Sequence, residues 1–257
     1  MSDTARTTAV SVITVVFNGA RHLQDCLDSV ARQRGLAIEH IVIDGGSTDG
    51  TVEMLQAWSD RIAFWISEPD AGIADAMNKG IRKARGEWLV FLHADDFFTG
   101  SDEVLKDCVQ AAGDAAVAAF PVFFGTPPKL EFRPPRRAGW AINLKMGMCH
   151  QGMLTRRQLF QDVGLYDTSF RIDMDYDFLM RAHRAGARFV SFHTPTLAVM
   201  RDTGISSRTD WPSIRGRFLE ERRIHFAHAT SAWQRLAYTL YWSLYLPYRR
   251  LVALTKA

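Results

Sequence analysis

The chain has 257 residues, of which 47% are hydrophobic and 23% are charged. This composition excludes an intrinsically disordered chain, and the length is sufficient for one α/β domain with a sizeable core. The formal net charge of +3 is unevenly distributed, because residues 211–257 contribute +6 (eight Lys or Arg against two Glu) and residues 1–210 contribute −3. The basic C-terminal segment is therefore expected to meet something anionic, such as phospholipid or nucleic acid.

The cysteines and the start of the chain indicate a compartment. Cys26, Cys108 and Cys149 are odd in number and form no CxxC pair, so we expect no disulfide framework and a reducing cytoplasm. The first ten residues are polar and show no secretory signal, and no run of 18 apolar residues predicts a spanning helix. We therefore predict a cytoplasmic location.

The first 124 residues alternate between strand-like and helix-like segments. β-Branched and apolar runs predict strands at 11–17, 38–44, 62–67, 88–93 and 115–124. Helical spacing or composition predicts helices at 23–30, 51–58, 72–84 and 102–112, and Gly86 is expected to end the third. This alternation predicts βαβ units and a mostly parallel sheet with right-handed crossovers.

Three polar or glycine-rich segments stand at predicted strand ends, at residues 17–18, 44–46 and 93–96. In open α/β sheets, ligands bind beyond the carboxyl ends of the strands. We therefore expect the three segments to open onto one crevice.

The pattern changes after residue 125. Residues 125–139 contain four prolines and four basic residues, which predicts a loop or an irregular hairpin. Helices are expected at 154–163 and 175–185, the latter ended by Gly186, and a late strand at 189–192. We predict one catalytic domain at 1–210 and a helical tail at 211–257.

Asp95 and Asp96 are adjacent carboxylates at a strand end. They repel each other and cannot both be buried without a partner. A divalent cation such as Mg²⁺ or Mn²⁺ resolves this conflict, because it prefers oxygen ligands and often bridges carboxylates to substrate phosphates. A helix N-cap or a turn explains the pair equally well.

Asp44 ends a strand and precedes the turn Gly-Gly-Ser-Thr-Asp-Gly. Its carboxylate could accept hydrogen bonds from a base or a ribose, and the glycines would let a ligand approach the backbone. The alternative is a plain turn capped by Ser47 or Asp49.

Asp173, Asp175 and Asp177 alternate in the segment RIDMDYDFLMR. The helix macrodipole explains one or two acids at a helix start, but three exceed what capping requires. A general base for an acceptor hydroxyl needs such a carboxylate. His150, which precedes Gln151 after an apolar stretch, is explained more simply as a structural residue.

Together these segments resemble the family 2 glycosyltransferases, which have the GT-A fold. The resemblance runs from Ser11 to about Arg208. It is carried by SVITVVFNGARHLQDCLDSV, HIVIDGGSTDGT, SEPDAGIADAMNKGIRKARGEWLVFLHADD, HQGMLTRR and DMDYDFLMRAHRAG. The D-x-GI-x-DAMNKGI form is most similar to bacterial enzymes that build cell-surface polysaccharide. The resemblance implies inverting transfer of a sugar from a nucleotide diphosphate-sugar to an acceptor hydroxyl, in polysaccharide or glycolipid biosynthesis.

The resemblance also implies which residues bind the donor. Thr14, Phe17 and Asn18 would line the nucleoside pocket, and Asp44 would hydrogen-bond the base with Ser47 nearby.

Further substrate contacts follow from two other matching segments. Asp75, Asn78 and Lys79 fall where family members contact the donor, and Lys79 could neutralise the diphosphate. The HQGMLTRR segment places His150 and Gln151 in the substrate-binding set.

The resemblance assigns the metal to the end of the fourth predicted strand. Asp95 corresponds to the last acid of the family's DxD motif and would help to hold Mn²⁺ or Mg²⁺, with Asp96 beside it. His93 replaces the usual first acid, and its imidazole could ligate the metal or face the ribose.

Asp175 aligns with the acid that the family uses as general base. The preceding residue is usually Glu but is Met174 here, and Asp173 or Asp177 could share the role. The segment 204–207 resembles the mobile loop that covers the donor, and Arg201 or Arg208 would reach phosphate.

The segment Ser231–Ala257 is rich in Trp, Tyr and Leu. Aromatic residues beside arginines are typical of segments at a membrane surface, so we predict peripheral contact with the inner face of the cell membrane. The prediction rests on Trp242, Tyr245, Arg249 and Arg250 and would suit a lipid-linked acceptor. Packing on the catalytic domain or on a dimer partner is the alternative. No recognisable nucleic-acid-binding module accompanies the charge, so nucleic acid is not expected as a partner.

Two other functions are weighed against transfer. A nucleotidyltransferase would have a Gly-rich basic signature near the first strand, which VVFNGARHL lacks. A non-catalytic sugar-nucleotide-binding or membrane scaffold protein is favoured by His93 and Met174. The presence of Asp44, Asp95 and Asp175 in one chain argues against it.

Overall fold

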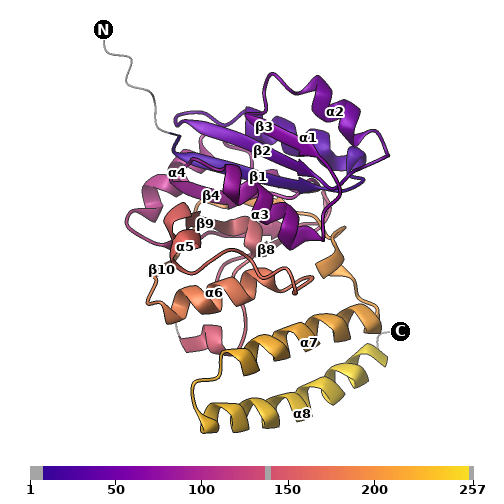
Figure 1. The fold of residues 1–257 in the computed structure, drawn as a ribbon, viewed down its shortest axis with the longest axis vertical. Helices are drawn as coiled ribbons and strands as arrows, with labels where there is room; N and C mark the ends of the chain where they lie inside the picture. The colour runs from indigo at the N-terminus through magenta and orange to yellow at the C-terminus, as the bar shows by residue number, and fades with distance from the viewer. Residues whose placement is uncertain (1–7, 137–139, 255–257) are drawn as a thin grey trace.

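The computed structural model describes residues 8–136 and 140–254 (Figure 1). Predictions that fall on residues 1–7, 137–139 and 255–257 lie outside the described residues. They concern the polar start of the chain, the end of the proline-rich loop and the end of the tail.

A seven-stranded sheet in the order β10-β6-β9-β4-β1-β2-β3 forms the centre of the fold. Its strands are β1 (Val10–Val16), β2 (Ile38–Asp44), β3 (Phe64–Ser67), β4 (Trp88–Phe91), β6 (Val117–Ala119), β9 (Met153–Arg156) and β10 (Phe189–Ser191). All neighbouring strands pair in parallel except β9, which is antiparallel to both β4 and β6. The prediction of a mostly parallel α/β sheet is confirmed.

Helices cover both faces of this sheet. Apolar clusters place α1 (Ala20–Ala31), α2 (Thr51–Ala57) and α4 (Val104–Ala112) on one face. The other face carries α3 (Ile73–Lys83), α5 (Arg157–Asp162) and α6 (Met174–Arg184). Along β1, Val12 points into the first layer while Ile13 and Val15 point into the second. A strand buried on both faces reads as a continuous apolar run, as β1 does.

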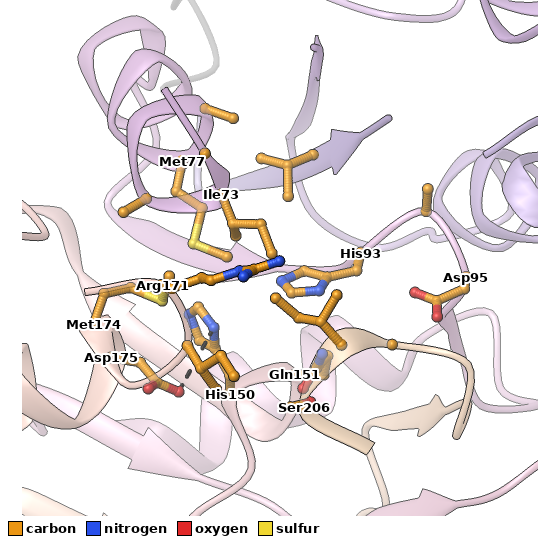
Figure 2. Close-up of a pocket in the computed structure, with 18 of the residues that line it drawn as sticks. Ile73, Met77, His93, Asp95, His150, Gln151, Arg171, Met174, Asp175 and Ser206 are labelled. Carbon is orange, nitrogen blue, oxygen red and sulfur yellow. Dashed lines mark ion pairs between the residues drawn. The ribbon is translucent and has the colours of Figure 1, made fainter. Parts of the chain in front are cut away.

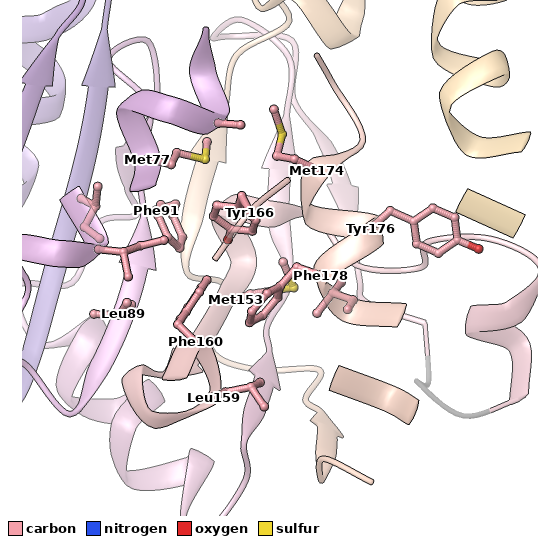
Figure 3. Packing of buried hydrophobic residues seen from close by; sticks show 14 of the residues in the cluster. Met77, Leu89, Phe91, Met153, Leu159, Phe160, Tyr166, Met174, Tyr176 and Phe178 are labelled. Atoms are coloured by element: carbon pink, nitrogen blue, oxygen red, sulfur yellow. The ribbon is translucent and has the colours of Figure 1, made fainter. Parts of the chain in front are cut away.

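Aromatic rings pack between the sheet and the start of α6 (Figure 3). Phe160 stacks on Phe178 with centroids 4.2 Å apart, and Tyr166 meets both rings edge-on. Phe91, at the end of β4, lies 5.5 Å from Tyr166. This cluster fixes the N-terminus of α6 against the carboxyl end of β4.

Residues 115–124, predicted as one strand, form two strands in different sheets. After β6 the chain passes through Phe120 and Pro121 to β7 (Val122–Phe124). A proline cannot donate to a strand ladder, so the run is interrupted there. β7 joins a second sheet, in the order β5-β11-β7-β8, with β5 (Phe97–Phe98), β8 (Glu131–Arg133) and β11 (Ala198–Met200).

The helix predicted at 154–163 is also wrong in its first half. Residues Met153–Arg156 form β9, which pairs with β4 and β6, and only Arg157–Asp162 is helical. Short apolar runs do not separate a buried strand from a helix, and here pairing on both edges decides the outcome.

Gly86 does not end α3 as predicted, because the helix ends at Lys83 and Ala84 is already extended. Instead the Gly86 N–H donates to the Ser11 hydroxyl at 2.8 Å, and an added Cβ would lie 2.5 Å from the Ser11 nitrogen. The remaining predicted elements match the observed ones apart from small shifts at their ends.

The C-terminal segment forms two antiparallel helices, α7 (Trp211–Ala227) and α8 (Ala232–Leu254), with α8 outermost (Figure 1). Asp210 caps α7 by accepting the Ser213 N–H at 3.0 Å. Short 3₁₀ turns occur at Trp140–Asn143, His150–Gly152 and Ile205–Ser207. Among the described helices, none combines the length and the hydropathy needed to cross a bilayer.

Polar contacts join the two helices to the α/β part of the chain. The Tyr176 hydroxyl of α6 lies 3.0 Å from His225 Nε2 of α7. The Tyr238 hydroxyl of α8 donates to the Asn143 carbonyl at 2.7 Å. Trp242 is buried between the helices and donates to His225 Nδ1, so it cannot form the membrane contact predicted for it.

Candidate active site

A cleft of about 960 Å³ opens at the carboxyl ends of β1 and β4. It is lined mainly by residues 15–19, 70–74, 93–96, 148–151, 168–175 and 203–206. Two of the three predicted strand-end segments, 17–18 and 93–96, therefore meet in one crevice. The third lies behind its wall, because an added Cβ on Gly45 would lie 2.6 Å from the Asp70 carboxylate.

His93, Asp95 and Asp96 come together directly after β4. Their ligand atoms all lie within 4.8 Å of one another. His93 Nε2 is buried and has no hydrogen-bond partner in the described part of the chain. Burial lowers the pKa of His93, which keeps the imidazole neutral. Two carboxylates and an unpartnered imidazole nitrogen form a donor set that suits a divalent cation.

Asp96 is almost fully buried and accepts the Arg201 N–H at 2.9 Å. Gln151 also hydrogen-bonds to it, so this predicted residue lies beside the acids. Burial, followed by the nearby charge of Asp95, raises the pKa of Asp96 well above its usual range. A cation would oppose this shift, because it stabilises the ionised carboxylate. Asp95 accepts a hydrogen bond from the Thr203 hydroxyl.

Asp175 lies in the first turn of α6 and faces the cleft (Figure 2). Its Oδ1 accepts the Tyr176 N–H at 2.8 Å, and its Oδ2 lies 3.9 Å from His150 Nδ1. Burial raises the pKa of Asp175 to about 7. A carboxylate with this pKa is suited to act as a base near neutral pH.

The other two acids of the series differ from each other. Asp173 also lines the cleft, and its Oδ2 is buried without a partner among the described residues. Burial, and then the charge of Asp175, raise the pKa of Asp173 to about 8. Asp177 points away and pairs with Arg181 and His228, each at 2.9 Å. Against the effect of burial, these bonds hold its pKa below the usual range, so Asp177 cannot share the base role.

His150 is buried beside Asp175 and lines the cleft. Its Nε2 lies 3.1 Å from the Tyr166 hydroxyl, and its ring centroid lies 4.8 Å from that of Phe91. Burial lowers the pKa of His150 to about 3, so the ring is neutral. A neutral imidazole does not stabilise the Asp175 carboxylate by charge.

Phe17 and Asn18 lie at the rim of the cleft, and their contacts with the donor stay predictions. The Phe17 ring is 66% exposed and available to a ligand. Asn18 accepts the Thr48 N–H at 2.9 Å and donates its own N–H to the Ser47 hydroxyl at 2.7 Å. Ser47 therefore shapes the rim without lining the cleft.

Two predicted donor residues are buried behind this rim. The Thr14 hydroxyl lies 2.9 Å from His40 Nε2 in the interior. Asp44 is fully buried and accepts the Ser47 N–H at 2.9 Å and the Ser67 hydroxyl at 2.6 Å. These hydrogen bonds stabilise the carboxyl ends of β1 and β2. The contacts of both residues with the donor stay predictions.

The α3 residues also have partners within the protein. Asn78 holds the backbone of Tyr166 through two hydrogen bonds, of 2.9 and 3.0 Å. Lys79 pairs with Glu68 at 2.8 Å and with Asp75 at 3.7 Å. None of Asp75, Asn78 and Lys79 lines the cleft, so their predicted donor contacts remain untested.

Arg171 was not predicted as a site residue. Its side chain extends across the cleft toward His93 (Figure 2). Within residues 8–136 and 140–254, its guanidinium makes no hydrogen bond or ion pair. Arg201, in contrast, donates to the Asp95 carbonyl at 2.7 Å and to Asp25 at 2.5 Å. Arg171 is thus a cation of the cleft that is free to meet an anionic ligand. The signal in the sequence was an arginine two residues before the acid series.

One part of the cleft wall is apolar and rich in methionine. It is formed by Ile73 and Met77 of α3, by Met146 and Met148, and by Met174 of α6. Methionine side chains are flexible and adapt to irregular apolar ligands. This wall adjoins the Asp175 carboxylate, so an apolar group of a ligand can lie next to it.

Glu220 of α7 holds the loop that carries the site acids. Its Oε1 accepts the Arg171 N–H at 2.9 Å, and its Oε2 accepts the N–H groups of Ile172 at 2.9 Å and Asp173 at 3.0 Å. Three backbone donors in the segment just before α6 are thereby satisfied by one carboxylate. No local sequence pattern relates position 220 to this loop, so sequence reasoning missed it.

We expect Glu220→Ala to lower the free energy of unfolding by about 2 kcal/mol, because three backbone N–H groups lose a charged acceptor. Urea denaturation measures this change. Glu103→Ala is the matched control, since Glu103 pairs with Lys106 at the surface and such pairs contribute at most about 1 kcal/mol. Equal losses in the two variants would contradict the role of Glu220.

Comparison with known proteins relates the chain to glycosyltransferases. The family described as Glycosyl transferase family 2 matches residues 11–175. An uncharacterised glycosyltransferase of Mycobacterium tuberculosis is 38% identical over 180 residues, which cover 67% of this chain and 68% of the relative. A PGL/p-HBAD biosynthesis glycosyltransferase of Mycobacterium bovis is 32% identical over 213 residues, which cover 77% and 79%.

Two solved structures share the fold at low sequence identity. The mannosyltransferase PcManGT from Pyrobaculum calidifontis, in complex with GDP-Man and Mn²⁺, superposes with a TM-score of 0.66 at 19% identity. The match covers 96% of this chain and 73% of that one. S. aureus TarS 1–349, in complex with UDP-GlcNAc, gives a TM-score of 0.64 at 18% identity and covers 77% and 59%.

Proposed function

The chain belongs to glycosyl transferase family 2, and from this premise we propose that it transfers a sugar from a nucleotide diphosphate-sugar to an acceptor hydroxyl with inversion at the anomeric carbon. One observation carries the proposal. A single cleft contains a carboxylate with a pKa of about 7, Asp175, together with the cation-binding set at 93–96.

The chemistry follows from these positions. Asp175 takes the proton of the acceptor hydroxyl while the oxygen forms a bond to the anomeric carbon. The bond between that carbon and the diphosphate oxygen breaks, and the nucleoside diphosphate leaves with its electron pair. Attack and departure on opposite sides of one carbon invert its configuration.

The leaving group carries negative charge that the cleft has to stabilise. Arg171 is free to pair with a diphosphate. Asp95 and Asp96, with His93, would hold Mn²⁺ or Mg²⁺, which supplies positive charge to the departing phosphates. We propose that Phe17 contacts the nucleoside, because its ring is exposed and lines the cleft.

We further propose a lipid-linked or glycolipid acceptor and peripheral attachment to the cytoplasmic face of the membrane. The apolar wall of the cleft beside Asp175 supports such an acceptor. A relative named for PGL/p-HBAD biosynthesis supports the same class.

The direct test is nucleoside diphosphate release from a panel of UDP-, GDP- and dTDP-sugars, with Mn²⁺ or with EDTA. We expect slow, metal-dependent release from one donor, because water replaces the missing acceptor. Calorimetry of the same nucleotides is the control. Neither release nor binding with any donor would contradict the proposal and favour a scaffold with a degenerate site.

A further inference from the structure

The outer side of α8 carries an apolar stripe, defined as seven exposed large side chains: Trp233, Leu236, Leu240, Leu244, Tyr248, Leu251 and Leu254. Their exposed fractions run from 48% to 80%. Because they recur every three or four residues, they lie on one side of the helix. Surface helices normally turn such a side toward a core.

The inward side of α8 already has its partner. Tyr238 and Trp242 are buried against Phe218 of α7, and Tyr245 packs beside them. The helix therefore has two apolar sides, and α7 covers one. Within the described residues, nothing covers the apolar stripe.

The charges around the apolar stripe are of one sign. The sequence from 231 to 257 contains no Asp or Glu. Arg235 and Arg250 are exposed on α8, while Arg249 turns inward over the Phe218 ring, 5.0 Å from its centroid. A Leu-rich stripe with Trp and Tyr and only basic charges complements a surface that is apolar inside and anionic outside.

We propose that the apolar stripe of α8 docks the protein on an anionic phospholipid membrane. A second copy of the chain fits this surface less well, because two such stripes would bring arginines together with no acid to pair them. The membrane contact thus lies on the side of α8 opposite Trp242.

The position of α8 connects this surface to the cleft. α7 lies between them: its Arg217 lines the cleft and donates to the Ser206 carbonyl at 2.6 Å. A membrane that contacts the apolar stripe would therefore lie close to the cleft, with α7 and α8 between them. The docking rests on the proposed peripheral attachment, but not on which sugar is transferred.

The test is co-sedimentation of the full chain with vesicles of phosphatidylglycerol and phosphatidylcholine in equal parts. We expect binding that weakens in high salt and with pure phosphatidylcholine. Leu240→Glu with Leu244→Glu should lower the partition coefficient by about tenfold or more, since two apolar side chains no longer enter the interface.

Leu130→Glu is the matched control, because Leu130 is an exposed leucine beside β8, outside the apolar stripe. It should leave vesicle binding unchanged. Loss of binding in the control, or no binding by the wild type, would overturn the proposal. A dimer that the double variant dissociates, seen by light scattering without vesicle binding, would assign the apolar stripe to a second copy instead.

Donor hydrolysis by the same variants separates this proposal from the proposed function. The double variant should keep wild-type hydrolysis, which shows that its fold and cleft are intact. If the wild type bound vesicles but released no nucleotide from any donor, the docking surface would stand and the transfer reaction would not.

Discussion

Asp175→Asn should lower kcat by about 10³-fold, because general base catalysis typically contributes two to four powers of ten. The amide has nearly the shape of the carboxylate but cannot take the acceptor proton. Donor affinity should change little, since Asp175 lies beside the apolar wall and its hydrogen-bond partner is the Tyr176 N–H. Single-turnover kinetics with calorimetry of the donor would separate the two effects.

The pH dependence of kcat/KM tests the same role of Asp175. Burial raises the pKa of Asp175 to about 7, so the base is protonated below this pH. Wild-type kcat/KM should fall about tenfold per unit as the pH drops below 7. The residual activity of Asp175→Asn should lose this dependence. A wild-type profile that is flat down to pH 5 would rule out Asp175 as the base.

The same substitution should stabilise the fold at pH 8. The Asp175 carboxyl has a pKa of about 7 in the folded protein against 3.8 as the ordinary value, so stability falls as the pH rises between them. Above pH 7 the ionised group opposes folding by on the order of 4 kcal/mol, which Asn removes. Asp177→Asn is the control on the same helix. It should destabilise the protein, because Arg181 and His228 lose their partner.

Chelation of divalent cations, or Asp95→Ala, should lower turnover by about 10² to 10³-fold, because a cation at a transferring phosphate supplies several kcal/mol. Asp102→Ala is the control, since Asp102 is an exposed acid near Arg34 and outside the cleft. Activity that survives EDTA would remove the metal role from the 93–96 segment.

Calorimetry with Mn²⁺ tests the ligand set without any turnover. Asp95→Ala should weaken the binding of Mn²⁺ because it removes a carboxylate ligand. His93→Ala should weaken it as well, which would identify the imidazole as a ligand. Unchanged affinity in His93→Ala would leave the ring to the ribose instead.

The sheet and the place of the site could be predicted from local patterns. β1 and β4 are apolar runs that end in polar residues, and parallel strands bring such ends to one edge. Residues 17–18 and 93–96 therefore lie in one cleft as expected, whereas residues 44–46 do not line it. The choice of Asp175 rested on the family resemblance and not on the strand ends. The split between β6 and β7 was not predictable, because it depends on pairing with strands far along the chain.

The donor residues show the limit of motif-based assignment. Asp44 and Asn78 lie in the matching segments, yet each is held by backbone groups of the protein itself. A motif records that a side chain is needed but not whether it touches the ligand. Arg171 and Glu220 are the opposite case, because they contribute to the site but belong to no motif. Their roles depend on contacts between segments that are far apart in the sequence.

The contacts of α7 and α8 divide the residues of the C-terminal segment into two groups. One group is required by the fold, and the other can be substituted without disturbing it. Glu220 and His225 are fitted to the catalytic domain, so a chain cut before residue 211 would release the loop that bears Asp173. The outward side chains of α8 are largely exposed in the described fold. On the docking proposed for the apolar stripe, variation there would redirect the enzyme to a different lipid surface without altering its chemistry. An engineer can exploit the same freedom by rewriting only those positions.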